Sequence, residues 1–256
     1  MQRPRYNVVV PTELGAMIIN RHDTGVGHQL AATGTYEPDE MALFETFVQS
    51  LRRDDPVVLD IGANIGTHAL RLAGLIGARG AVHAFEAQRI VFHMLCGNVA
   101  LNSVENVWCH HLALGAEPGL LAIPQFDYDR PLSFGSIEFG AEQREPIGQQ
   151  RGDDPTRVEY VRMDTVDQLD FPAVHLMKID VEGMELAVLQ GARDTIARDR
   201  PLIFLEYLKG DRRELAAWLL RHSYRVFPHR HNWLCLPPGS PLQPHGSAEI
   251  TDPAHA

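Results

Sequence analysis

VVLDIGANIGTH occupies residues 57–68 of this 256-residue chain and joins an apolar run to a helical pattern through a glycine-rich turn. The run is apolar except for Asp60, as in a strand that is buried on both faces. Gly62 and Gly66 permit backbone conformations that other residues avoid. The helix that follows offers free N–H groups to an anionic ligand group. This stretch therefore predicts a buried parallel strand with a nucleotide-type ligand at its end.

Two features narrow the identity of that ligand. Asn64 stands at the middle glycine position of the dinucleotide fingerprint G-x-G-x-x-G, which disfavours a dinucleotide. Glu86 follows the next apolar run and comes about 20 residues after Gly66, where an acidic group accepts hydrogen bonds from ribose hydroxyls. The dipole of the next helix would also favour a carboxylate there without any ligand. Together these residues predict an adenosine pocket, and they leave NAD and S-adenosylmethionine both open.

Apolar runs alternate with helical patterns through most of the chain, which is typical of a parallel sheet covered on both faces. We predict an α/β fold with a Rossmann-like, mostly parallel sheet, a closing antiparallel hairpin and helices on both faces. This layout resembles the class I methyltransferase sheet. The expected strands are 57–61, 81–85, 107–114, 174–179 and 201–206, the expected helices are 39–51, 67–76, 88–101, 185–197 and 214–222, and the expected hairpin strands are 224–227 and 232–236.

The predicted domain covers residues 39–236, and residues 1–38 precede it as an extended segment with a hairpin. A polar, turn-rich insertion at about 125–157 interrupts the alternation. Connections of this length are commonly lids or binding loops, so we expect a lid there. Residues 237–256 are rich in Pro, Gly and Ser and predict an unstructured tail.

The composition excludes several classes of protein. Apolar residues make up 45% and charged residues 22% of the chain, as in an ordinary globular protein. The net charge of −10 disfavours a nucleic acid or a membrane surface as partner. The cysteines Cys96, Cys109 and Cys235 are odd in number and form no C-x-x-C, which argues against disulfides and cysteine zinc sites. Because residues 1–15 lack the apolar region of a signal peptide, we expect a cytoplasmic protein.

MKIDVEGMELAVLQGA, residues 177–192, places charged residues at the end of the fourth predicted strand. Alternation along a strand puts Lys178 and Asp180 on the same face. A lysine inside an apolar strand is costly unless it is paired or functional, so both interpretations stay open. Glu206 ends the fifth strand and should lie beside Asp180. Two such acids can hold a divalent metal or orient a hydroxyl, and without a third ligand a metal stays unassigned.

Several of these motifs together resemble the FkbM family of S-adenosylmethionine-dependent O-methyltransferases. The resemblance covers about residues 30–210 and is carried by VLDIGANIGTH, HAFEA, LALG, MDTVDQL, MKIDVEGMELAVLQGA and PLIFLEY. It implies a methyltransferase sheet, S-adenosylmethionine as cofactor, and a hydroxyl of a sugar, glycan or glycosylated natural product as methyl acceptor. The closing hairpin is shorter than this resemblance leads us to expect, so it does not identify the acceptor.

The resemblance also implies which residues contact the cofactor. Asp180, at the carboxyl edge of the sheet where ligands of open α/β sheets bind, is expected to contact it as well. The SFGS segment, residues 133–136, resembles a lid near the acceptor. The implied contacts are Asp60, Gly62, Asn64 and Gly66 at the methionine end, Glu86 at the ribose, Leu112 and Ala113 at the adenine, and Tyr36 and Glu37 closing over the cofactor.

The expected chemistry is direct in-line transfer of the sulfonium methyl group to an acceptor oxygen, for which the protein mainly aligns the reactants. Because a protonated alcohol is a poor nucleophile, a base or a metal should assist. We predict Asp180 as the base, Glu206 as its orienting or metal partner, and Lys178 as a second candidate base. The alternatives are a non-catalytic adenosine-binding scaffold and an NAD(P)-dependent oxidoreductase, although the sequence contains neither G-x-G-x-x-G nor a Tyr-x-x-x-Lys relay.

Overall fold

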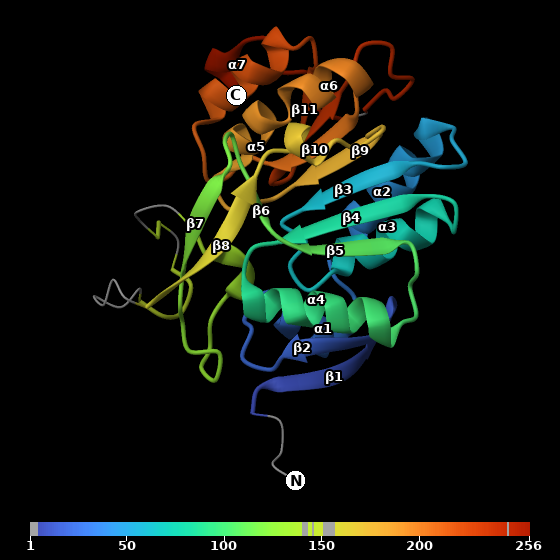
Figure 1. The fold of residues 1–256 in the computed structure, drawn as a ribbon. Helices are drawn as coiled ribbons and strands as arrows, with labels where there is room; N and C mark the ends of the chain where they lie inside the picture. Colours follow the sequence, from blue (N-terminus) through green and yellow to red (C-terminus); the bar gives the residue numbers. More distant parts are fainter. Residues whose placement is uncertain (1–4, 140–142, 145, 151–156, 245) are drawn as a thin grey trace.

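A seven-stranded sheet forms the centre of the molecule (Figure 1). The computed structural model describes residues 5–139, 143–144, 146–150, 157–244 and 246–256. β12 runs antiparallel to both of its neighbours, whereas the neighbouring strands from β10 to β5 pair in parallel. The predicted Rossmann-like α/β fold with a closing antiparallel hairpin is confirmed. In spatial order the strands are β11 (Arg225–His229), β12 (Asn232–Leu236), β10 (Leu202–Glu206), β9 (Leu176–Ile179), β3 (Val57–Ile61), β4 (Ala81–Glu86) and β5 (Val107–His111).

Side chains of the central strands alternate between two apolar cores, one on each face of the sheet. In β3, for example, Val58 packs into one core and Leu59 into the other. Asp60 of β3 and Lys178 of β9 are partners in the strand register, so opposite charges lie side by side within the sheet. The strand order reverses between β3 and β9, and open α/β sheets bind ligands at the carboxyl ends of the strands at such a point.

Helices cover both faces of the sheet, as predicted (Figure 1). Apolar residues of α2 (Pro38–Leu51), α3 (Thr67–Ile76) and α4 (Arg89–Leu101) belong to one core. Those of α5 (Glu185–Gly191), α6 (Arg193–Asp199) and α7 (Arg212–Arg221) belong to the other.

The helix expected at 185–197 is in fact two helices that divide at Ala192. The N–H groups of Asp194 and Thr195 donate to the carboxylate of Asp167, at 3.0 and 2.8 Å. A distant carboxylate therefore satisfies the first free donors of α6 and starts a new helix there.

The N-terminal segment is a hairpin of β1 (Asn7–Thr12) and β2 (Gly15–Asn20), followed by α1 (Val26–Thr33), a helix that the sequence analysis did not predict. Two asparagines of α4 fix the hairpin to the domain. The side-chain oxygen of Asn98 accepts a hydrogen bond from the N–H of Ile18 at 2.5 Å, and that of Asn102 accepts one from the N–H of Ala16 at 3.0 Å. The hairpin thus pairs with α4 through side-chain amides.

The strand expected at 107–114 divides at Leu112, where the chain leaves β5 and enters a separate three-stranded sheet. That sheet has the order β6 (Ala113–Leu114), β8 (Val158–Asp164), β7 (Gly119–Pro124). The predicted insertion at 125–157 therefore connects two antiparallel strands, β7 and β8. The lid expectation for residues 140–142, 145 and 151–156 lies outside the described residues.

The described part of the C-terminal segment differs from the unstructured tail that its composition predicts. The N–H of Ile250 donates to the carbonyl of Val226 at 2.8 Å, and the side chain of Ile250 packs into a core at 7% exposure. A 3-10 turn, Pro253–His255, follows beside α7. Because the composition of this segment is rich in turn residues, the sequence did not indicate that Ile250 packs into a core. Among the described residues, no helix is both long and apolar enough to cross a bilayer.

Candidate functional site

Two adjoining cavities lie at the carboxyl ends of β3, β4 and β9. The first cavity extends from this edge toward β6, and the second extends toward the start of α2 and the β11–β12 hairpin. They share a wall that includes Tyr36, Asn64, His68, Lys178, Asp180 and Glu182. A molecule in one cavity can therefore reach a molecule in the other across these side chains.

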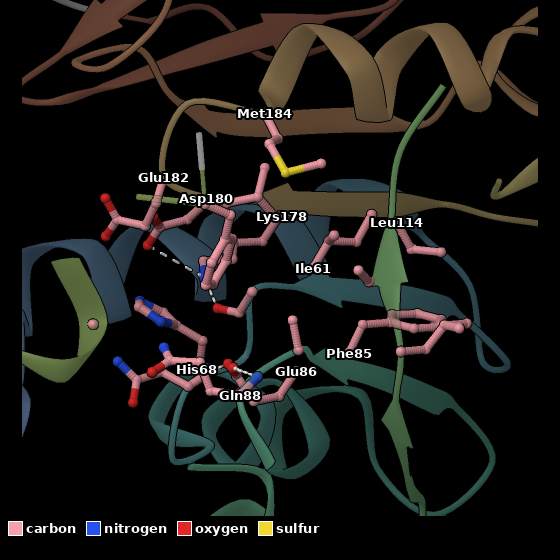
Figure 2. Close-up of a pocket in the computed structure, with 18 of the residues that line it drawn as sticks. Ile61, His68, Phe85, Glu86, Gln88, Leu114, Lys178, Asp180, Glu182 and Met184 are labelled. Carbon is pink, nitrogen blue, oxygen red and sulfur yellow. Dashed lines mark hydrogen bonds and ion pairs between the residues drawn. The ribbon is translucent and has the colours of Figure 1, made fainter. Parts of the chain in front are cut away.

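The first cavity has an apolar end and a polar end. Figure 2 shows Phe85 and Leu114 at one end, and Lys178, Asp180 and Glu182 at the other. Leu112 and Ala113, which the resemblance implies for an adenine, also line this cavity. An elongated ligand with one flat apolar part and one charged part matches this division.

A glycine brings the strands together at the polar end. The φ angle of Gly62 is +79°, and a Cβ atom there would lie 1.8 Å from the backbone oxygen of Asp180. Only glycine permits this approach, so Gly62 sets the distance between the ends of β3 and β9. Asn64, with φ of +51°, then directs its side chain toward the 133–136 segment, where it lies close to Gly135.

Glu86 lies at the end of β4 and lines the first cavity between its two ends. Its carboxylate accepts hydrogen bonds from the N–H of Asn64 at 2.9 Å and of Gln88 at 2.7 Å. Burial raises the pKa of Glu86 to about 7, although these two hydrogen bonds oppose the shift. The backbone therefore orients this carboxylate firmly, and its lining position leaves it in reach of a ligand.

Lys178 links the two strands whose ends meet here. Its Nζ donates to the carbonyl of Gly62 at 2.8 Å and lies 3.4 Å from Asp60 and 3.5 Å from Asp180. Burial alone would lower the pKa of Lys178, but the two carboxylates outweigh it and raise the pKa. The lysine is thus held protonated, which argues against its predicted role as a base.

Two residues expected to contact the ligand are not in contact with the cavities. Within the described part of the chain, Asp60 and Gly66 line neither cavity. Asp60 is completely buried, and burial raises its pKa although Lys178 opposes the shift. Asp60 therefore acts on the cavity through Lys178, and Gly66 acts through the backbone turn that begins α3.

Three acids meet where the cavities join. Asp180, Glu182 and Glu206 each offer an oxygen, and these oxygens lie within 4.8 Å of one another. Asp180 and Glu206 lie close together as predicted, and Glu182 joins them as a third acid. Burial and then the neighbouring Asp180 raise the pKa of Glu206 to about 9 and that of Glu182 to about 8. Lys209 forms an ion pair with Glu182, so this cluster already holds a cation.

The SFGS segment lies over the first cavity on the side of α4. Gln88 donates through Nε2 to the carbonyl of Phe134 at 2.9 Å. A Cβ atom on Gly135 would lie 2.7 Å from the amide nitrogen of Asn64, and Gly135 lines both cavities. Gly135 of this segment therefore forms part of the wall of both cavities, and the lid stays a prediction.

The segment before α2 also contributes residues to the walls of the cavities. Tyr36 lines both cavities, whereas Glu37 lines only the second. Glu37 has φ of +44°, a left-handed conformation that is uncommon outside glycine. The expectation that both residues close over a cofactor therefore fits Tyr36 better than Glu37.

Sequence reasoning missed several lining residues. Phe85, Leu114 and Met184 contribute to the first cavity, but their patterns are those of core residues. Glu40 lines the second cavity, and its place in the first turn of a predicted helix, close after Glu37, was the available signal. His68 lies in the shared wall, and only its place in the first turn after the glycine loop pointed to it.

Comparisons with known proteins identify relatives of this chain. Methyltransferase 1 of Beauveria bassiana (strain ARSEF 2860) is 27% identical over 199 residues, which is 70% of this chain and 76% of that protein. The crystal structure of Methyltransferase FkbM from Methylobacillus flagellatus KT has the same fold, with a TM-score of 0.50 and 19% identity. That match covers 78% of this chain, which spans only 50% of the Methylobacillus chain. Residues 60–226 match the Methyltransferase FkbM domain, and the chain therefore belongs to that family.

Proposed function

We propose that this protein is an S-adenosylmethionine-dependent O-methyltransferase that acts on a hydroxyl of a sugar, a glycan or a glycosylated natural product. The observation that carries the proposal is the pair of adjoining cavities with a shared polar wall. In this proposal one cavity would bind the methyl donor, and the other would bind the acceptor. The shared wall is where the methyl group would pass.

The side chains that line the first cavity support its assignment to the donor. Its apolar end would take the adenine between side chains such as Phe85 and Leu114. Glu86 would accept hydrogen bonds from the ribose hydroxyls. The carboxylate of Asp180 at the polar end would attract the positive sulfonium, which favours S-adenosylmethionine over an uncharged ligand.

The second cavity is lined mainly by polar groups, among them Ser133, Ser136, Glu206 and Asn232. Such hydroxyl, carboxyl and amide groups form hydrogen bonds with an acceptor that carries several hydroxyls. This composition supports a sugar-like acceptor over an apolar one.

The reaction would be an in-line displacement. The acceptor oxygen forms a bond to the methyl carbon while the carbon–sulfur bond breaks and its electron pair stays on sulfur. The hydroxyl proton would pass to Asp180, which lies in the shared wall. The protonated Lys178 positions Asp180, and Glu206 beside it can donate a hydrogen bond to the acceptor because its raised pKa keeps its proton.

Thermal unfolding of the whole chain tests the donor. A ligand at about 100 times its Kd adds about 2.7 kcal/mol, which raises Tm by about 5–10 °C for a domain of this size. We expect this rise with S-adenosylmethionine and S-adenosylhomocysteine and none with NAD or NADP. A rise with NAD alone would overturn the proposal in favour of an oxidoreductase. Binding of the sulfur cofactors without methyl transfer to any sugar in a broad panel would favour a non-catalytic scaffold.

A further inference from the structure

Glu37, Glu40 and His68 form a cluster in the second cavity that the proposed methyl transfer does not use. Each offers one ligand atom, and these atoms lie within 4.8 Å of one another. The three residues come from different elements, since the glutamates belong to the start of α2 and the histidine to the first turn of α3. The packing of α2 against α3 therefore assembles the cluster.

The histidine of this cluster lacks the partner that its burial demands. His68 is only 7% exposed, and its Nε2 finds no hydrogen-bond partner among the described residues. The carboxylate of Glu37 lies 3.6 Å from that nitrogen, beyond a normal hydrogen bond. A buried nitrogen without a partner costs free energy, so its orientation toward two carboxylates indicates a missing ligand.

The two carboxylates are also held in place. Glu40 is 5% exposed, and its Oε1 accepts a hydrogen bond from Nδ2 of Asn232 at 2.8 Å. This bond orients the carboxylate as the outer contacts of metal ligands do. Glu37 is oriented by its left-handed backbone, with φ of +44°. The cluster thus presents two fixed acids and one imidazole to the same space.

We propose that Glu37, Glu40 and His68 bind a divalent first-row transition metal ion. Bonds of about 2.0–2.2 Å to nitrogen and oxygen place two ligand atoms about 3.4 Å apart in a tetrahedral site. The 3.6 Å between His68 and Glu37 already matches this spacing. Two carboxylates neutralise a divalent ion, and imidazole with carboxylates selects Zn²⁺, Mn²⁺, Fe²⁺ or Co²⁺ over Ca²⁺.

The neighbouring acids Asp180, Glu182 and Glu206 make a weaker candidate. They are all carboxylates, and Lys209 forms an ion pair with Glu182 while Lys178 lies 3.5 Å from Asp180. Ammonium groups therefore already occupy the positions that a metal would take there. In the cluster with His68, the side-chain amide that donates to Glu40 comes from Asn232 and carries no charge.

The metal site has a consequence that rests on the proposed function. All three ligands line the second cavity, so an ion with an open coordination position would face the acceptor. A hydroxyl bound to a divalent ion loses its proton more easily, which would assist Asp180. Metal binding itself does not depend on methyl transfer, and the two can fail separately.

Cobalt titration of the tag-free, chelator-treated chain tests the proposal, because Co²⁺ bound to imidazole and carboxylates gives a visible absorption spectrum. We expect one Co²⁺ per chain, displaced by Zn²⁺. His68→Asn and Glu40→Gln should each weaken binding about tenfold or more. His93→Asn and Glu45→Gln are matched controls, since both side chains are exposed and Glu45 lies on the same helix as Glu40. Circular dichroism shows whether each variant is folded.

Three results would overturn the proposal: no Co²⁺ binding by the wild-type chain, binding that His68→Asn and Glu40→Gln leave unchanged, or binding that is lost in Glu206→Gln and kept in His68→Asn. The last result would move the ion to the other acids. These outcomes are read from cobalt absorption alone, whereas failure of the proposed function would appear as absent binding of S-adenosylmethionine.

Discussion

The ammonium group of Lys178 holds three oxygens together at the meeting point of β3 and β9, and the free energy of this arrangement is testable. Lys178→Met would leave the completely buried Asp60 without its cation. We expect a loss of about 3–5 kcal/mol in the free energy of unfolding, measured by urea denaturation. The double variant Asp60→Asn, Lys178→Met removes both charges and should lose clearly less. Equal losses in both would show that the pair is not coupled.

Asp180 is the residue on which the proposed proton transfer depends. Asp180→Asn keeps the size of the side chain but removes the base, so methyl transfer should fall by about 10²-fold or more. Affinity for S-adenosylmethionine should change much less, because the apolar end and Glu86 remain. Transfer of labelled methyl groups to a panel of mono- and oligosaccharides measures the rate. Asp54→Asn, an exposed substitution, is the control, and full turnover by Asp180→Asn would remove this residue from the chemistry.

Glu86 predicts opposite pH dependences for binding and for folding. Burial raises its pKa from 4.5 to about 7, while a ribose is bound best by the ionised form. Affinity for S-adenosylhomocysteine should therefore fall as the pH drops from about 8 to about 6. Calorimetry measures this affinity, and Glu86→Gln should remove the dependence. A wild-type affinity that stays constant over this range would contradict the assignment.

The carboxyl group of Glu86 affects folding stability in the opposite direction, because its protonation stabilises the folded chain although it weakens ligand binding. Between pH 4.5 and about 7 the folded chain binds a proton at Glu86 that the unfolded chain has lost. The stabilising contribution of this proton is fully present below pH 4.5 and is lost as the pH rises through about 7. The unfolding free energy of wild type, relative to that of the non-titrating Glu86→Gln, should thus rise as the pH falls from about 7 to about 4.5, which urea denaturation at several pH values measures.

At the scale of elements, the division between α5 and α6 depends on one carboxylate. Asp167→Ala removes the acceptor for the N–H groups of Asp194 and Thr195. The free energy of unfolding should fall by about 0.5–2 kcal/mol, as for loss of a helix cap, and thermal denaturation measures this. The exposed Asp54→Ala serves as control. An unchanged Tm would show that α6 begins at Arg193 for other reasons.

Elements whose signal is local were predicted from sequence, and elements defined by distant partners were not. The strand 57–61 and the closing hairpin were found because continuous apolar runs and turn residues lie within a few positions. β7 and β8 pair across the insertion at 125–157, so no pattern in the residues near either strand predicts the pairing. The helix at 185–197 divides because of Asp167, which is remote in sequence.

The same distinction applies to the candidate site. Gly62, Asn64, Glu86, Asp180 and Glu206 follow strand ends, and parallel strands bring their ends to one edge, so their meeting was predictable. The cluster of Glu37, Glu40 and His68 arises from the packing of α2 on α3. Because the angle at which two helices pack cannot be predicted from the sequence of either helix alone, this cluster was not predicted.

At the scale of the whole molecule, the C-terminal segment adds Ile250 to the core on the α5–α7 side of the sheet. Ile250 bridges to β11 and is 7% exposed, so Ile250→Ala should cost about 2 kcal/mol or more. For a domain of this size that lowers Tm by about 4 °C or more, which calorimetry measures. Val9→Ala, at a position that is 60% exposed, is the control. Ile250 lines neither cavity, so the shift in Tm caused by S-adenosylhomocysteine should persist in the variant. If Tm stays within about 1 °C of wild type, the segment contributes no core packing in solution. It would then be the unstructured tail that its turn-rich composition predicts.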